Sequence, residues 1–451
     1  MKITKYFLLL LSIALLIPAC ESKLNLEGKA PGVVYFAKSG YNKLISYEVG
    51  EAYTADIWIG KGGLTSGNTT VEFIVTQSIL DSVNLVDGTN YQLLPSECYS
   101  IKSSTVEIPS DSSVMKGAIT YYPDKIAKLA GFDMEKYALP LKLSSKSGFS
   151  INPEKDEMLL TFVVSDPTVK ILNPGFNEID ITDENIKSLD VNIGVEFTNK
   201  WDIKVALAHN QSIVDAYNTA NNSYYVLMPA TMYEGPAQVD IKQGVKSAIA
   251  SFTLLKNKLM PGNYILPIQI ASLQSSLNGT PTDVIKFDGA SSTMFAFSKM
   301  GTKIPKKGWT IESFTTEEPA EGQWGNGGKA IHLIDDDVKT FWHARWSGGD
   351  DPLPYQITID MHANYLVSQI EIITRGPDSN NPIKVLSFET SKDGVNWTFV
   401  GKFPHQNIAT PLLFAVKSTE ARYIRMTLPD GENTSRIAAL RELSAYGQAI
   451  N

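Results

Sequence analysis

Short segments in which hydrophobic and polar residues alternate recur along most of the chain. Residues 55–59 (ADIWI) and 71–76 (VEFIVT) are examples, and Gly, Pro, Asn and Ser residues separate such segments. A period of two places successive side chains on opposite faces of a strand. The pattern returns in residues 355–360 (YQITID) and 423–428 (YIRMTL), and Asp393-Gly394 predicts a tight turn. The chain is therefore predicted to be all-β, with antiparallel sheets.

The first two thirds of the chain contain two related copies of one segment. Three pairs of stretches match: 78–84 with 212–218, 91–95 with 225–229, and 137–143 with 264–270. The first two pairs are offset by 134 residues (212 − 78) and the third by 127 (264 − 137), so the second copy carries a net deletion. Two tandem β-sandwiches are predicted, at residues 30–167 and 168–298. No His, Cys or Ser constellation recurs around the matched Asp81 and Asp215, so we expect these residues to make turn hydrogen bonds rather than to catalyse.

Length and charge limit the function further. A chain of 451 residues predicts about three domains. The net charge of −8, with no block of Lys and Arg after the first residues, argues against nucleic acid as a partner, because phosphate binding needs clustered cations. A neutral glycan or another protein surface remains open.

The first 20 residues have the composition of a targeting segment. Lys2 and Lys5 precede the apolar run 7–17, and a small residue precedes Cys20. This segment resembles a bacterial lipoprotein signal, which implies cleavage before Cys20, lipid attachment to it, and a location at the outer membrane, facing the cell surface. The alternative is an ordinary secretory signal. The other cysteine, Cys98, is expected to be a buried free thiol.

The third domain is predicted at residues 309–451, after a Lys-, Gly- and Pro-rich linker at 299–308. Its most informative stretch is 333–346 (LIDDDVKTFWHARW). Successive carboxylates suit a hard cation such as calcium. Aromatic faces beside His and Arg donors suit a sugar ring. The alternative reading is a polar turn that precedes a strand with a core Trp.

The repeated segments resemble the tandem DUF1735-type modules of Bacteroidetes surface lipoproteins. The residues that carry this resemblance are D-x-[YV]-N, then Y-x-L-[LM]-P, then a late Y-x-L-P-[LI]-x-[LI] strand. In that family the modules act as spacers or accessory domains, with no assigned reaction.

The third domain resembles the F5/8 type C (discoidin) family and its carbohydrate-binding relatives in family 32. Five motifs occur in the family's order: an acidic loop with T-x-W at 335–342, P-x-x-I-x-I-D at 354–360, S-x-D-G-x-x-W at 391–397, A-R-Y-I-R at 421–425 and E-L-x-x-Y-G at 442–447. The resemblance implies a jelly-roll β-sandwich. Asp336 stands where the family usually has Gly.

The same resemblance implies roles for individual residues. A structural calcium ion would be bound by Asp335, Asp337, Thr340 and Glu442. His343 and Arg375 would hold sugar hydroxyls, with Trp346 or Trp324 as the aromatic platform. Trp342 and Trp397 would lie in the core. The alternative for Arg375 is that it only pairs with Asp378.

Together these features predict a non-catalytic, surface-exposed lipoprotein that binds a glycan through its third domain, in partnership with an outer-membrane glycan-uptake complex. The alternative is an adhesin whose third domain binds a host or partner protein. Convergence of His343, Trp346 and Arg375 favours sugar, whereas a flat apolar patch would favour protein.

Overall fold

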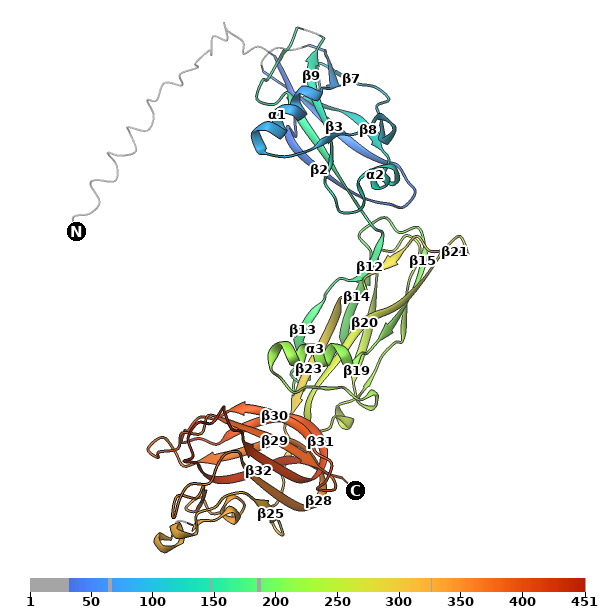
Figure 1. The fold of residues 1–451 in the computed structure, drawn as a ribbon. Coiled ribbons are helices and arrows are strands. Elements are labelled where there is room, and N and C mark those ends of the chain that lie inside the picture. Colours follow the sequence, from blue (N-terminus) through green and yellow to red (C-terminus); the bar gives the residue numbers. More distant parts are fainter. Residues whose placement is uncertain (1–31, 64–66, 147, 185–187, 326, 451) are drawn as a thin grey trace, which may run out of the picture. The chain divides into compact units, whose positions relative to one another are not determined.

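A computed structural model describes residues 32–63, 67–146, 148–184, 188–325 and 327–450 (Figure 1). The chain divides into two compact units after Asp166. The targeting segment and Cys20 lie outside the described residues. Within those residues, no helix is long and apolar enough to cross a membrane.

The first unit is a sandwich of two sheets. One sheet has the order β10 (Ser150–Ile151), β1 (Val33–Phe36), β3 (Tyr53–Gly62), β8 (Val114–Tyr121), β6 (Tyr99–Ser100). The other has the order β2 (Gly40–Tyr47), β11 (Glu157–Ser165), β9 (Tyr137–Ser145), β4 (Thr69–Val75), β7 (Thr105–Ile108), and β5 (Gln92–Leu93) pairs with β9. Helices α1 (Gln77–Asp87) and α2 (Pro123–Ala130) complete it. Cys98 is buried in its core as a free thiol, as expected.

The second sandwich repeats this strand order, at the start of the second unit. One sheet runs β17 (Tyr233–Glu234), β19 (Ser247–Leu254), β14 (Leu189–Gly194), β12 (Thr168–Ile171), β22 (Lys286–Phe287). The other runs β13 (Gly175–Glu178), β23 (Ser292–Lys299), β20 (Gly262–Leu277), β15 (Asp202–Ala208), β18 (Gln238–Ile241), and β16 (Val226–Leu227) and β21 (Thr280–Thr282) pair with β20. The prediction of two copies of one β-domain is confirmed.

The prediction of wholly antiparallel sheets is wrong at the sheet edges. In the first copy β1 pairs with β10 and β2 with β11 in parallel, and in the second copy β12–β22 and β13–β23 do the same. Each of these pairs joins the beginning of a copy to its end. The rest of the domain lies between the two strands and supplies the long crossover that parallel pairing needs.

The best-conserved stretch of the repeat forms a helix in both copies, α1 and α3 (Gln211–Asn221). Each helix ends at a left-handed residue, Gly88 in one and Asn222 in the other, as is common at helix C-termini. Asp81 and Asp215 each accept a hydrogen bond from the Gln four residues before, at 2.8 and 2.9 Å. These Asp residues therefore make local hydrogen bonds, as expected, although on a helix and not in a turn.

The repeated Asn of this stretch ties the helix to the following Tyr. In the second copy the Asn218 amide donates to the Tyr225 carbonyl at 2.8 Å and accepts from the Tyr225 N–H at 2.9 Å. In the first copy Asn84 makes the same two bonds with Tyr91, both at 2.9 Å. A side chain that satisfies both backbone groups of one residue fixes the exit of the chain from the helix.

Asn218→Ala is expected to loosen this exit by about 1–2 kcal/mol, because it leaves two backbone groups of Tyr225 without a protein partner. Amide hydrogen exchange at Tyr225 should become roughly tenfold faster. Asn221→Ala is the matched control, since Asn221 makes one exposed bond from the same helix, to the Tyr217 carbonyl. Equal acceleration at Tyr225 in both variants would contradict this role for Asn218.

The third domain is a sandwich built from one bent sheet. Its order is β26 (Gly327–Gly328), β27 (Phe341–His343), β32 (Ala439–Ala449), β28 (Tyr355–Thr374), β31 (Leu412–Leu428), β29 (Val385–Ser391), β30 (Thr398–Pro404), with β24 (Thr302–Lys303) on β32 and β25 (Thr310–Phe314) on β28. The long strands β28 and β31 pair with each other in three stretches, separated by breaks in register before Tyr365 and before Gln369. Such breaks bend strands, so the same strands reach both layers.

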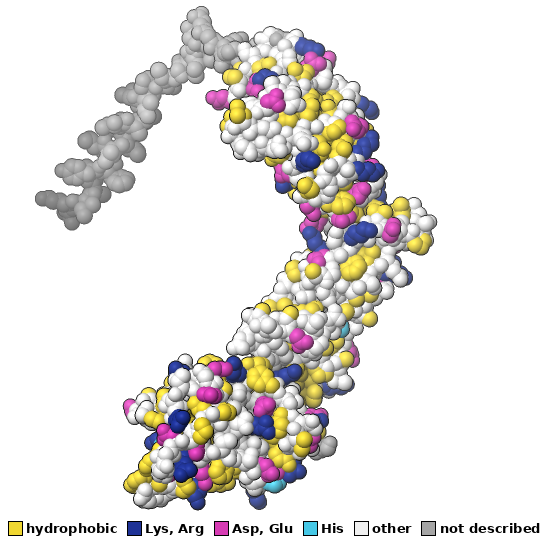
Figure 2. Space-filling model, in the orientation of Figure 1, with side chains coloured by type: hydrophobic (Ala, Val, Ile, Leu, Met, Phe, Trp, Pro, Cys, Tyr) yellow, Lys and Arg dark blue, Asp and Glu magenta, His cyan; other side chains and the backbone are white. Residues whose placement is uncertain are grey.

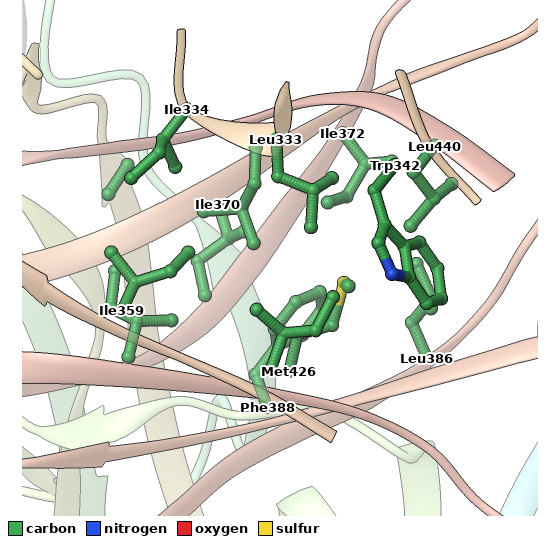
Figure 3. Close-up of a cluster of buried hydrophobic side chains, with 14 of the residues drawn as sticks. Leu333, Ile334, Trp342, Ile359, Ile370, Ile372, Leu386, Phe388, Met426 and Leu440 are labelled. Atoms are coloured by element: carbon green, nitrogen blue, oxygen red, sulfur yellow. The ribbon is translucent and has the colours of Figure 1, made fainter. Parts of the chain in front are cut away.

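The core of this domain lies between the two layers (Figure 3). Trp342 is fully buried among Leu386 and Leu440, and its indole N–H donates to the Thr316 carbonyl at 2.8 Å. Its predicted core position is therefore confirmed. Trp397 is a correction: this residue is only partly buried, and the Arg425 guanidinium lies over its ring, 3.6 Å from the ring centroid.

The predicted linker at 299–308 is part of folded structure. Lys299 ends β23, and Thr302–Lys303 forms β24 on the C-terminal strand β32. Lys306 is buried. Composition alone indicated a linker, but these residues extend the sheet of the third domain.

Candidate functional site

Two short 3-10 segments and the strand β27 bring together the loops at one end of the third domain. The segments are η4 (Pro319–Trp324) and η5 (Ala330–Leu333). Between them Gly327 and Gly328 have φ of 92° and 85°, and a Cβ at Gly328 would lie 2.0 Å from the Glu318 carbonyl oxygen. Only glycine permits this approach, which places η4 beside the parallel strand pair β26–β27.

Hydrogen bonds to Glu318 connect the residues that follow β27 to η4. Its fully buried carboxylate accepts hydrogen bonds from the Trp346 N–H at 2.8 Å, the Ser347 hydroxyl at 2.7 Å and the Ala320 N–H at 3.0 Å. Burial alone would raise the pKa of Glu318, but these donors outweigh it and hold the pKa at about 2. The charged carboxylate therefore fixes the backbone that carries Trp346.

Glu318→Gln is expected to destabilise the third domain by about 2–3 kcal/mol near neutral pH, because backbone donors lose a charged acceptor. The folded-state pKa is depressed, so this contribution is present above the ordinary pKa of 4.5 and is lost as pH falls toward 2. Chemical denaturation at neutral and acidic pH measures the difference between variant and wild type. A difference that does not shrink on acidification would contradict the assignment.

Glu321, in η4, lies at the centre of the predicted sugar-binding residues. One carboxylate oxygen, Oε1, bonds to His343 Nδ1 at 2.8 Å and accepts from the Trp346 indole N–H at 3.3 Å. The Glu321 and His343 side chains are mostly covered, with 11% and 12% of their surface exposed. A single carboxylate oxygen thus holds both the His343 ring nitrogen and the Trp346 indole N–H.

The two tryptophans form an exposed aromatic surface next to this carboxylate. The Trp324 and Trp346 rings are stacked, with centroids 6.1 Å apart and planes 26° from parallel. Trp324 is 58% exposed and Trp346 is 42% exposed. Figure 2 shows hydrophobic side chains at the surface of this end of the third domain, where Figure 1 draws the gold coil of η4.

Arg375 completes the group from the loop after β28. Its guanidinium lies 4.0 Å from the centroid of the Phe341 ring, and Phe341 makes an edge contact with His343. Burial lowers the pKa of Arg375, and the charge of Glu321 opposes this shift. The guanidinium therefore packs on a ring and lies within the field of the central carboxylate.

The structure brings together all four predicted ligand residues. They are His343, Trp346, Trp324 and Arg375, and we call them, with Glu321, the tryptophan site. Sequence reasoning missed Glu321 and Glu318. The run Glu317, Glu318 and Glu321 ahead of Trp324 was the available signal, but acidic residues in a polar loop are usually solvated.

In the predicted calcium loop, the Asp335 and Asp337 carboxylates hydrogen-bond to neighbouring residues of the same loop. Asp335 bonds to His332 Nδ1 at 2.7 Å and accepts from the Thr340 hydroxyl at 2.8 Å. The Asp337 carboxylate accepts from the Lys339 N–H at 2.9 Å, so it caps an exposed turn. Asp336 has φ of 61°, the left-handed conformation in which Gly costs least, and this explains the family's usual Gly.

The fourth predicted calcium ligand, Glu442, forms an ion pair with a lysine. Its carboxylate contacts the ammonium group of Lys306, and both side chains are only 3% exposed. Burial, together with the neighbouring Asp335, raises the pKa of Glu442 to about 7, while Lys306 opposes the rise. Within the described part of the chain, no group of three His, Cys, Asp or Glu side chains is arranged for a metal ion. The Lys306 ammonium group therefore lies against a carboxylate that the predicted calcium ion would bind.

Comparison with known proteins agrees with this domain order. A family model for an N-terminal domain, of the DUF1735 type, matches residues 28–150 and 164–277, which together exceed half of the chain. The model of the F5/8 type C domain matches residues 313–443.

Individual relatives match about a third of the chain. A sialidase of Micromonospora viridifaciens is 29% identical over 143 residues, which are 31% of this chain and 21% of the sialidase. The chain thus spans about a fifth of the length of this curated relative.

Two examples illustrate the solved structures to which the chain is similar. The C-terminal domain of a chitobiase from Bacteroides fragilis is 50% identical, covering 33% of this chain and 99% of that domain, with a TM-score of 0.32. The family 32 carbohydrate-binding module of NanJ from Clostridium perfringens, solved with galactose, is 27% identical, covering 32% and 98%, with a TM-score of 0.28. The chain belongs to the family of proteins with tandem N-terminal domains of the DUF1735 type, and it carries an F5/8 type C domain after them.

Proposed function

We propose that the third domain binds a glycan at the tryptophan site. The observation that carries this proposal is the pair of stacked, exposed indoles beside a carboxylate that bonds to both His343 and Trp346. A sugar ring presents an apolar C–H face, which suits an indole, and a rim of hydroxyls, which suits nitrogen donors and carboxylate acceptors.

The roles within the site follow from which atoms are already engaged. His343 Nδ1 is bound to Glu321, so Nε2 is the ring nitrogen that meets a sugar hydroxyl. Arg375, held against Phe341, donates to a second hydroxyl. Trp346 and Trp324 cover the apolar face of the sugar. None of these roles includes a nucleophile or a proton transfer, so binding without catalysis is the proposed activity.

The proposal for the whole protein is a lipoprotein anchored at the cell surface through Cys20, which presents this site to glycans within a glycan-utilisation system. The targeting segment and the tandem accessory-type domains support it. A single shallow sugar site binds weakly, because it excludes little water. Many anchored copies on one membrane would raise the apparent affinity for a repetitive glycan.

A glycan array tests the proposal, with the protein produced from the residue after Cys20. The wild type should retain one class of glycan, and His343→Ala should lose it. His362→Ala is the matched control, because His362 is an exposed histidine in the same domain that bonds to Thr310. Retention of no glycan would contradict sugar binding and favour a protein partner. Binding that survives His343→Ala, Arg375→Ala and Trp346→Ala would contradict the site.

A further inference from the structure

A buried lysine occupies the place where the acidic loop meets the last strand. Lys306 Nζ contacts the Glu442 carboxylate and lies 3.1 Å from Asp336 Oδ1. Only 3% of the Lys306 side chain is exposed. A buried ammonium group is unfavourable unless anionic partners compensate for its lost hydration, and here two carboxylates do so.

Backbone hydrogen bonds to the last strand set the position of Lys306. Strand β24 pairs with β32, with Thr302 opposite Gly447 and Lys303 opposite Tyr446, and the Ile304 N–H donates to the Ala445 carbonyl at 2.9 Å. The chain then turns at Lys306, whose carbonyl accepts from the Trp309 N–H at 2.9 Å. The position of the ammonium group is therefore fixed by sheet register, unlike that of a flexible lysine side chain on the surface.

On the other side, the acidic loop is shaped to meet this ammonium group. Asp336 adopts a left-handed conformation, which is strained for a residue with a side chain, and its carboxylate reaches Lys306. Asp335 is meanwhile engaged by His332 and Thr340, and its carboxyl group shares a hydrogen bond with Glu442. The loop thus offers Lys306 the charge of Asp336, which a Gly at this position would lack.

We propose that the ammonium group of Lys306 replaces the calcium ion that the family resemblance implies, so that this domain holds its acidic loop without a metal. One internal cation bridges the loop, through Asp336, and the last strand, through Glu442. A divalent ion bound to Glu442 would have to displace an ammonium group that the sheet holds in position. The consequence is a domain whose stability does not depend on calcium.

Thermal unfolding of the wild-type protein is the first test. The melting temperature should be the same with EDTA and with millimolar calcium, and calorimetric titration with calcium chloride should show no saturable binding at this domain. A melting temperature that falls in EDTA and returns with calcium would overturn the proposal.

Lys306→Met is the second test, with Lys307→Met as the matched control. Lys307 is the next residue and is exposed. Lys306→Met should lower the melting temperature in EDTA, or prevent folding, while Lys307→Met should leave it unchanged. Equal melting temperatures for the two variants would overturn the proposal. Where Lys306→Met does not fold, the calcium titration of the wild type still decides the question.

Discussion

Trp346→Ala should weaken glycan binding by roughly thirtyfold, or about 2 kcal/mol, the cost of removing a central aromatic contact from a binding site. The variant loses the ring that stacks with Trp324 and the indole N–H that donates to Glu321. Its backbone N–H still donates to Glu318, so the loop keeps its course. Isothermal titration with a glycan selected on the array measures the loss.

The matched control is Trp58→Ala, because Trp58 is an exposed tryptophan of the first sandwich, remote in sequence from the site. This variant should bind as the wild type does. Wild-type affinity in Trp346→Ala would show that the indole pair is not the platform, whereas a similar loss in both variants would point to a general effect of removing an exposed ring.

Trp342→Ala should destabilise the third domain by about 4 kcal/mol, through loss of a large core side chain and the cavity left behind. The change also leaves the Thr316 carbonyl without its indole donor. Because Trp342 is followed directly by His343 on β27, sugar binding should be lost at the temperature at which the third domain of the variant unfolds. Differential scanning calorimetry of the full chain should show the transition of the third domain at a lower temperature.

Trp397→Ala provides the comparison for that loss. Trp397 is only partly buried and its ring is covered by Arg425, so the expected cost is about 1 kcal/mol. If the two variants were equally stable, the division between a core tryptophan and a covered surface tryptophan would be wrong.

The alternating pattern predicted the strands well, because a half-buried strand imposes a period of two whatever its partners are. The internal repeat predicted two copies of one domain, and the strand orders agree. The helix at the matched stretch was missed, since an 11-residue segment with few buried residues, Ile79 and Leu80 in α1, gives little helical periodicity. The parallel edge pairs were missed because pairing between the ends of a domain leaves no local signal.

Within the site, His343, Arg375 and the alternative platforms Trp346 and Trp324 were implied by the family resemblance, and the structure places them together. Glu318 and Glu321 could not be found this way, because their roles depend on the turn that Gly327 and Gly328 permit. The same limit applies to Lys306. Its Lys-, Gly- and Pro-rich surroundings predicted a solvated linker, but the register of β24 on β32 places its ammonium group against Glu442.

The sugar site is tested most directly by a calorimetric titration of the array-selected glycan into the wild type, Glu321→Ala and Glu312→Ala. Glu312 is an exposed carboxylate on β25 of the same domain and serves as the control. Saturable binding is expected for the wild type and for Glu312→Ala, and none for Glu321→Ala. Unchanged binding by Glu321→Ala would contradict a sugar site built around this carboxylate.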